Sequence, residues 1–230
     1  MVEALHYVGL LSYLKTLEDT MTILKILITI ILDILLVTLG VKFISTRGDA
    51  DGEIILHKKG IILSILLISV FTLVNMFLNS GNVHRYIIFN TLCIYNTIMS
   101  YTDIQSKMVW PIISYITALI AIINLIVSNL LEIITIRITI KHLIIATVIM
   151  IVFKIIRAFG DGDLKIIWVN YIMILPMYGE LTPVISLITL LIVMLAFILI
   201  NIKSISKGKV RNAIAFAPYL MATILITMFI

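Results

Sequence analysis

The chain has 230 residues, of which 62% are hydrophobic and 13% are charged, with a net charge of +5. This charged share is about half that of an ordinary globular domain, which excludes a disordered chain, a coiled coil and a water-soluble fold. The composition indicates an all-α polytopic membrane protein, in which basic residues set the orientation and do not indicate nucleic-acid binding. A single cysteine, Cys93, allows no internal disulfide or cysteine-based zinc site, and we expect no metal and no cofactor.

The N-terminal residues 1–19 are expected to form a separate element. Their apolar run is interrupted by Lys15, Glu18 and Asp19, and no basic stretch precedes it, so they do not match a secretory signal. We expect a short amphipathic helix that lies along the membrane interface.

Eight segments then approach the roughly 20 apolar residues that a helix needs to cross a bilayer. In chain order they are residues 20–44, 60–79, 86–102, 108–131, 138–156, 166–178, 181–202 and 212–230. Residues 166–178 are the shortest, and seven spans are the alternative count if this segment only re-enters the membrane. Asp33 lies in the middle of the first span, where a carboxylate needs a polar partner, and we interpret it as a structural contact.

The orientation follows from the lysines and arginines at alternate ends of these spans. One side receives Lys42, Arg47, Lys58, Lys59, Lys107, Lys154, Arg157, Lys165, Lys203, Lys207, Lys209 and Arg211. The other side receives Lys15, Lys25, Arg85, Arg137 and Lys141. The positive-inside rule assigns the richer side to the cytoplasm. Residues 102–107, 157–165 and 203–211 are therefore expected to face the cytoplasm together.

Two aspartate-containing segments lie on that predicted face. Asp103 ends the third span, and Asp163 belongs to Gly-Asp-Gly-Asp-Leu-Lys at residues 160–165, whose glycines allow unusual backbone shapes and close approach. Two carboxylates held together near the bilayer surface share one proton. The ionised one can then activate a water while the protonated one polarises a peptide carbonyl. The pair predicts a peptide hydrolase that needs no metal.

Each segment alone has a simpler interpretation. An aspartate at the end of a membrane helix is commonly a solvated boundary residue, and Gly-Asp-Gly-Asp is commonly a turn. A glycine-rich turn can also bind phosphate, but the spacing G-x-x-x-x-G-K-[ST] is absent. The functional interpretation depends on both aspartates lying on one membrane face.

The sequence also resembles a known family. Asp-x-x-Ser-x-x-Val at residues 103–109 is followed, 60 residues after its aspartate, by Gly-x-Gly-Asp-x-Lys. This pattern resembles the GxGD aspartyl proteases of the type IV prepilin peptidase and archaeal preflagellin peptidase group. Ala-Phe-Ala-Pro-Tyr-Leu at residues 215–220 is a partial likeness to the family's Pro-Phe-Gly-Pro-Phe-Leu. The resemblance covers residues 86–230.

By this resemblance Asp103 and Asp163 form the catalytic pair, Gly160 and Gly162 shape the second segment, and Lys165 is a motif residue. The resemblance implies removal of a short basic leader from pilin-like or flagellin-like precursors at the cytoplasmic face. Asp161 is the candidate contact for that leader, with a turn-forming role as the alternative.

The resemblance also suggests a division of the chain. Residues 83–230 correspond to a six-helix aspartyl peptidase core, and residues 1–82 contain the interfacial segment and two extra transmembrane helices. The family's bifunctional members carry a cytoplasmic domain with Cys-x-x-Cys pairs after the first helix. Here only the loop at residues 45–59 occupies that place, so methyltransferase activity is not expected.

Three other functions remain open from the sequence. A presenilin-like or signal-peptide-peptidase-like enzyme would cut inside the bilayer, but such enzymes place tyrosine directly before the first aspartate, and here Thr102 separates Tyr101 from Asp103. An ion-coupled transporter would require Asp33, Asp103 and Asp163 to line one path. A non-catalytic scaffold of a secretion machine would keep the motifs without cleaving any peptide.

Overall fold

The computed structural model describes residues 2–46, 58–79, 81–106, 111–157, 159–206 and 215–230, and these are helical apart from short turns, with no strand. The helices are α1 Val2–Thr46, α2 Lys58–Asn79, α3 Val83–Ser106, α4 Pro111–Leu130, α5 Ile136–Ile155, α6 Asp161–Tyr178, the short 3₁₀ turn η1 Gly179–Leu181, α7 Thr182–Ser206 and α8 Ala217–Met228.

Five helical stretches in this part of the chain are long and apolar enough to cross a membrane. They are Thr22–Ile44, Lys59–Asn79, Pro111–Leu130, Ile136–Ile155 and Asp161–Ile202, the last of which contains α6, η1 and α7. Large leucine and isoleucine side chains are exposed along these helices, as lipid contact requires. The protein is therefore membrane-embedded. Helices α3 and α8 are not among the five, because α3 carries many polar residues and α8 is short.

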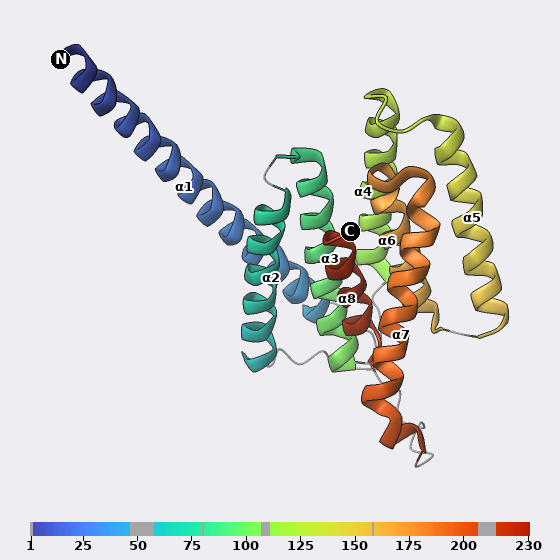
Figure 1. Cartoon of the computed structure of the whole chain (residues 1–230). Helices are drawn as coiled ribbons and strands as arrows, with labels where there is room; N and C mark the ends of the chain where they lie inside the picture. Colours follow the sequence, from blue (N-terminus) through green and yellow to red (C-terminus); the bar gives the residue numbers. More distant parts are fainter. Residues whose placement is uncertain (1, 47–57, 80, 107–110, 158, 207–214) are drawn as a thin grey trace.

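The N-terminal helix differs from the expected arrangement. The separate interfacial element and the first span are one continuous helix of 45 residues, Val2–Thr46. No glycine or proline occurs between residues 10 and 39, so nothing in the backbone ends the helix where the charged residues occur. The N-terminal part of α1 projects beyond the other helices (Figure 1).

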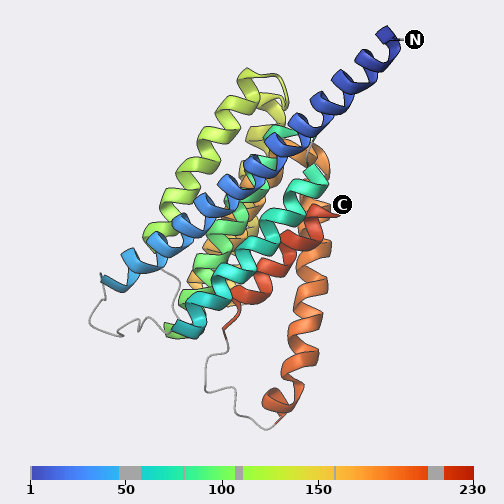
Figure 2. The same ribbon diagram turned by 90° about the vertical axis from the view of Figure 1, so that its left-hand side faces the viewer.

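Helices α3 and α6 occupy the middle of the bundle. Helix α3 packs against α1, α2, α6 and α8, while α6 packs against α4, α5, α7 and α8 (Figures 1 and 2). Side chains from Tyr95 to Asp103 are buried without interruption, so this part of α3 faces protein on all sides. This explains why α3 can hold polar residues that a lipid-facing helix would not.

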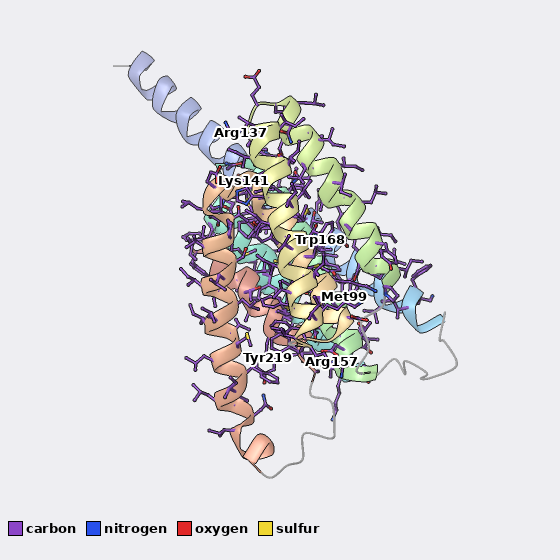
Figure 3. All side chains as sticks on the ribbon, turned by 90° about the vertical axis from the view of Figure 1, so that its right-hand side faces the viewer. Met99, Arg137, Lys141, Arg157, Trp168 and Tyr219 are labelled. Atoms are coloured by element: carbon purple, nitrogen blue, oxygen red, sulfur yellow. The ribbon has the colours of Figure 1, made fainter. Side chains whose placement is uncertain are left out.

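Successive helices run in opposite directions, so the last turns of α3, α5 and α7 and the first turns of α4, α6 and α8 share one end of the bundle (Figure 1). We call this the aspartate end, because Asp103 and Asp163 both belong to it. Arg157 and Tyr219 mark the aspartate end in Figure 3, and Arg137 and Lys141 mark the opposite end.

Candidate functional site

Asp103 is held at the aspartate end by the start of α8. Its side chain is buried, with 6% exposed, and its Oδ2 atom accepts a hydrogen bond of 2.9 Å from the backbone N–H of Ala217. Ala217 is the first residue of α8, and the first N–H groups of a helix have no partner within the helix. The positive end of the α8 dipole therefore points at the Asp103 carboxylate and stabilises it.

Asp163 is the third residue of α6 and belongs to the cap of that helix. Its carboxylate lies beside Gly160, the N-cap residue, where an acidic side chain of a capping box is found. This explains why α6 begins at Asp161, five residues before the expected span, since acidic residues in a first turn stabilise a helix start. Asp163 thus lies in the first turn of a helix, as expected from its place before the sixth span, and the alternative of an isolated turn is wrong.

The two glycines of this segment have no unusual backbone. Gly160 has φ −67° and ψ 154°, which any residue can adopt, and neither Gly160 nor Gly162 has a positive φ. A Cβ atom at residue 160 would lie 3.4 Å from Oδ2 of Asp163. The expected special backbone shape is therefore wrong for both glycines, and a Cβ atom at residue 160 would make an ordinary van der Waals contact with the carboxylate.

The structure brings Asp103 and Asp163 to the same end of two packed helices, α3 and α6. The two carboxylates are near enough for their charges to interact. Asp163 also lines a pocket of about 410 Å³. The site thus combines two neighbouring acidic groups with a space that a ligand can enter.

Aromatic rings form much of the wall of this pocket. Phe159, Phe197 and Phe216 line it, and the ring of Phe216 lies 5.6 Å from that of Phe159 and 5.1 Å from that of Phe197. Phe216 directly precedes Ala217, so the packing of its ring fixes the N–H group that binds Asp103. An apolar wall next to two carboxylates suits a ligand that presents an apolar side chain beside a polar group to be attacked.

Two further candidates of the second segment contact neighbouring helices. Asp161 lies 3.4 Å from Nζ of Lys154 in α5, and both side chains are exposed. Nζ of Lys165 lies 5.4 Å from the centre of the Tyr115 ring in α4. Asp161 therefore forms an ion pair with Lys154 at the surface. The side chain of Lys165 contacts Tyr115 and so links α6 to α4.

Asp33 lies in a different part of the bundle. It is 2% exposed, and its two oxygens accept hydrogen bonds from Thr72 Oγ1 at 2.6 Å and from Asn90 Nδ2 at 2.8 Å. These contacts join α1 to α2 and α3, which agrees with a structural role. Asn90 and Asp103 are separated by roughly 20 Å along α3. A relay through all three aspartates would have to bridge that distance.

Sequence reasoning missed the groups that hold these carboxylates in place. A backbone N–H such as that of Ala217 has no sequence signal of its own, although the likeness at residues 215–220 indicated the segment. The neighbouring Ser106 side chain, Lys107 and Trp110 lie outside the described residues. Within the described part of the chain, no group of three or more histidine, cysteine or acidic side chains could hold a metal ion.

Comparisons of the chain with protein-family models, with curated proteins and with solved structures found no match. The family likeness therefore rests on the motif residues themselves.

Proposed function

We propose that the protein is a membrane aspartic endopeptidase that removes a short basic leader from pilin-like or flagellin-like precursors at the cytoplasmic face. The observation that carries this proposal is the placement of Asp103 and Asp163 at the same end of the packed helices α3 and α6, where Asp163 lines a pocket. The arrangement of eight transmembrane helices, with the aspartate end on the basic, cytoplasmic side, belongs to the same proposal.

The chemistry follows from two carboxyl groups that hold one proton. The ionised group takes a proton from a water molecule while the water oxygen attacks the scissile carbonyl carbon. The protonated group donates its hydrogen bond to the carbonyl oxygen, where negative charge develops. Collapse of the tetrahedral intermediate breaks the C–N bond, and the leaving nitrogen takes a proton from the pair. The titration belongs to the pair and not to either aspartate alone.

The position of the site fits a substrate with a polar leader and an apolar helix. The helix can remain in lipid while the preceding segment reaches the aspartate end, and the aromatic wall of the pocket can hold an apolar side chain beside the cut. Asp161 remains the nearest acidic candidate for the leader. Its pairing with Lys154 means that a basic leader would have to displace that lysine.

The test is leader removal from a co-expressed pilin-like precursor, followed by gel shift and mass spectrometry. We expect Asp103→Asn and Asp163→Asn to abolish processing, and the matched Asp33→Asn variant, which changes a buried aspartate elsewhere, to process the precursor normally. Undiminished cleavage by either of the first two variants refutes the assignment. Mapping the cut also separates this proposal from a presenilin-like enzyme, which would cleave within the apolar helix.

A further inference from the structure

A second pocket, which we call the lateral groove, lies between α5, α6, α7 and α8 and has a volume of about 80 Å³. Its lining follows successive turns of the helices, as shown by Ile167, Asn170 and Ile174 on α6. Seven residues of helix cover about 10 Å, so the groove extends along two turns of the bundle. It is smaller than the roughly 150 Å³ cavity that holds a benzene ring, so it fits part of one side chain.

The groove is lined by small hydroxyl residues among aliphatic ones. Thr189, Thr223 and Thr227 donate hydrogen bonds to carbonyl groups of their own helices. Ser186 differs, because its Oγ atom is enclosed and has no hydrogen-bond partner. Small and hydroxyl side chains at a membrane-embedded face are typical of surfaces that pack against another helix. An enclosed hydroxyl without a partner is costly, and a rotation of the Ser186 side chain would let it donate a hydrogen bond to an occupant.

The groove leads toward the aspartate pocket. Phe153 of α5 lines the groove, and its ring lies 5.3 Å from the ring of Phe159, which lines the pocket that contains Asp163. A chain that lies along the groove and continues past Phe153 therefore arrives beside Asp163. Helix α5, which forms one wall, packs on α6 and η1 at the edge of the bundle.

We propose that the lateral groove binds the apolar helix of the substrate and so aligns the preceding segment with Asp103 and Asp163. This inference rests on the proposed peptidase function. One side chain of the substrate helix enters the groove near Ser186, and the remainder of the helix lies against α5 and α7.

The first test is cross-linking in the inactive Asp163→Asn protein with Cys93→Ala, which removes the native thiol. Ser186→Cys is combined with a synthetic precursor that has a basic leader and an apolar helix carrying one cysteine. We expect a disulfide cross-link to the precursor. The matched control is Ile188→Cys, which faces away from the groove on the same turns of α7 and is 48% exposed. Cross-linking at both positions, at neither, or only between two copies of the enzyme overturns the inference.

The second test separates the groove from the chemistry. Ser186→Phe fills the groove, and we expect at least a tenfold loss of kcat/KM for the full precursor. A short peptide that spans the leader and the cut site without the helix should be cleaved at the normal rate. That peptide also reports whether the variant is folded. Equal cleavage of the full precursor by wild type and variant overturns the proposed role of the groove and leaves the proposed peptidase function unaffected. Failure of the wild type on both substrates refutes the peptidase itself, and the inference with it.

Discussion

Two regions of the bundle bury aspartates in different ways. At the α1–α2–α3 contact, Asp33 has both oxygens bound by neutral side chains of neighbouring helices. At the aspartate end, Asp103 is bound by a backbone N–H, while Asp163 lies beside the N-cap of its own helix and also lines a pocket. A carboxylate enclosed by side chains contributes to packing, whereas the proposed peptidase chemistry needs neighbouring carboxylates beside an open space, and acidic groups in such places are candidates for function. The variants below test that difference.

The largest expected effect concerns the two aspartates as one unit. Asp103→Asn and Asp163→Asn should each lower cleavage by about 10²–10⁴-fold, the range for loss of an acid–base group. The double variant should be no slower than either single variant, because residues that act together are not additive. Steady-state cleavage of one precursor by all three variants measures this. If the two losses multiply, the aspartates act independently and the shared-proton mechanism is wrong.

Asp33→Ala should affect stability and leave the chemistry unchanged. The substitution removes the acceptor of Asn90, whereas the hydroxyl of Thr72 can donate instead to the carbonyl of Ile68, 2.9 Å away. One unpaired buried donor costs about 1–2 kcal/mol. Thermal unfolding in detergent should show the loss, and cleavage per folded molecule should match the wild type. A loss of cleavage with unchanged stability would mean that Asp33 takes part in catalysis or substrate binding. The contrast between Asp33 and the aspartate end would then be weakened.

The next variant tests whether the N-terminal helices support the site. A Cβ atom at Gly60 of α2 would lie 2.8 Å from Cε2 of Tyr101, two residues before Asp103. Gly60→Ala should therefore displace the end of α3, with a net destabilisation of about 1 kcal/mol after the better helix propensity of alanine is included. We expect reduced cleavage as well.

The control for this variant is Gly81→Ala, because nothing lies within 4 Å of a Cβ atom there. It should leave unfolding and cleavage unchanged. Equal effects of the two substitutions would show that α2 does not position Asp103.

The charge-free runs predicted the helices at residues 58–79, 111–130, 136–155 and 182–206 to within a few residues, because lipid contact leaves a composition signal. The same signal failed at two places. The charges at Lys15 and Glu18 suggested a break that the backbone does not make, and the charges at Asp161, Asp163 and Lys165 placed the start of the sixth span at residue 166, whereas α6 already begins at Asp161. Charge reports the surroundings of a helix, whereas its ends depend on capping geometry.

The site could be predicted only in part for a related reason. The motif spacing indicated Asp103 and Asp163, but their supports come from distant segments, since Ala217 is 114 residues from Asp103. Likewise, nothing near Asp33 in the sequence indicates Thr72 or Asn90. Such partners are set by how helices pack, and the sequence pattern of one helix contains no information about the face of another.

The smallest expected effect comes from two residues in the left-handed region, Arg157 with φ 53° and Glu132 with φ 56°. This conformation costs a non-glycine residue about 1–2 kcal/mol. Glycine avoids that cost, but it loses more backbone entropy on folding, which offsets part of the stabilisation. Arg157→Gly and Glu132→Gly should therefore each stabilise the protein by about 0.5 kcal/mol. Thermal unfolding in detergent measures both.

Their effects on cleavage should differ, because Arg157 lines the pocket of Asp163 whereas Glu132 lies in the turn between α4 and α5 at the opposite end. Loss of a cation beside the site should lower the KM for a basic leader about two- to fivefold, as expected for one exposed charge interaction. Glu132→Gly should leave KM unchanged. A higher KM for Arg157→Gly would instead mean that Arg157 attracts the substrate, and that an acidic or carbonyl group, not the basic leader, lies against this wall of the pocket.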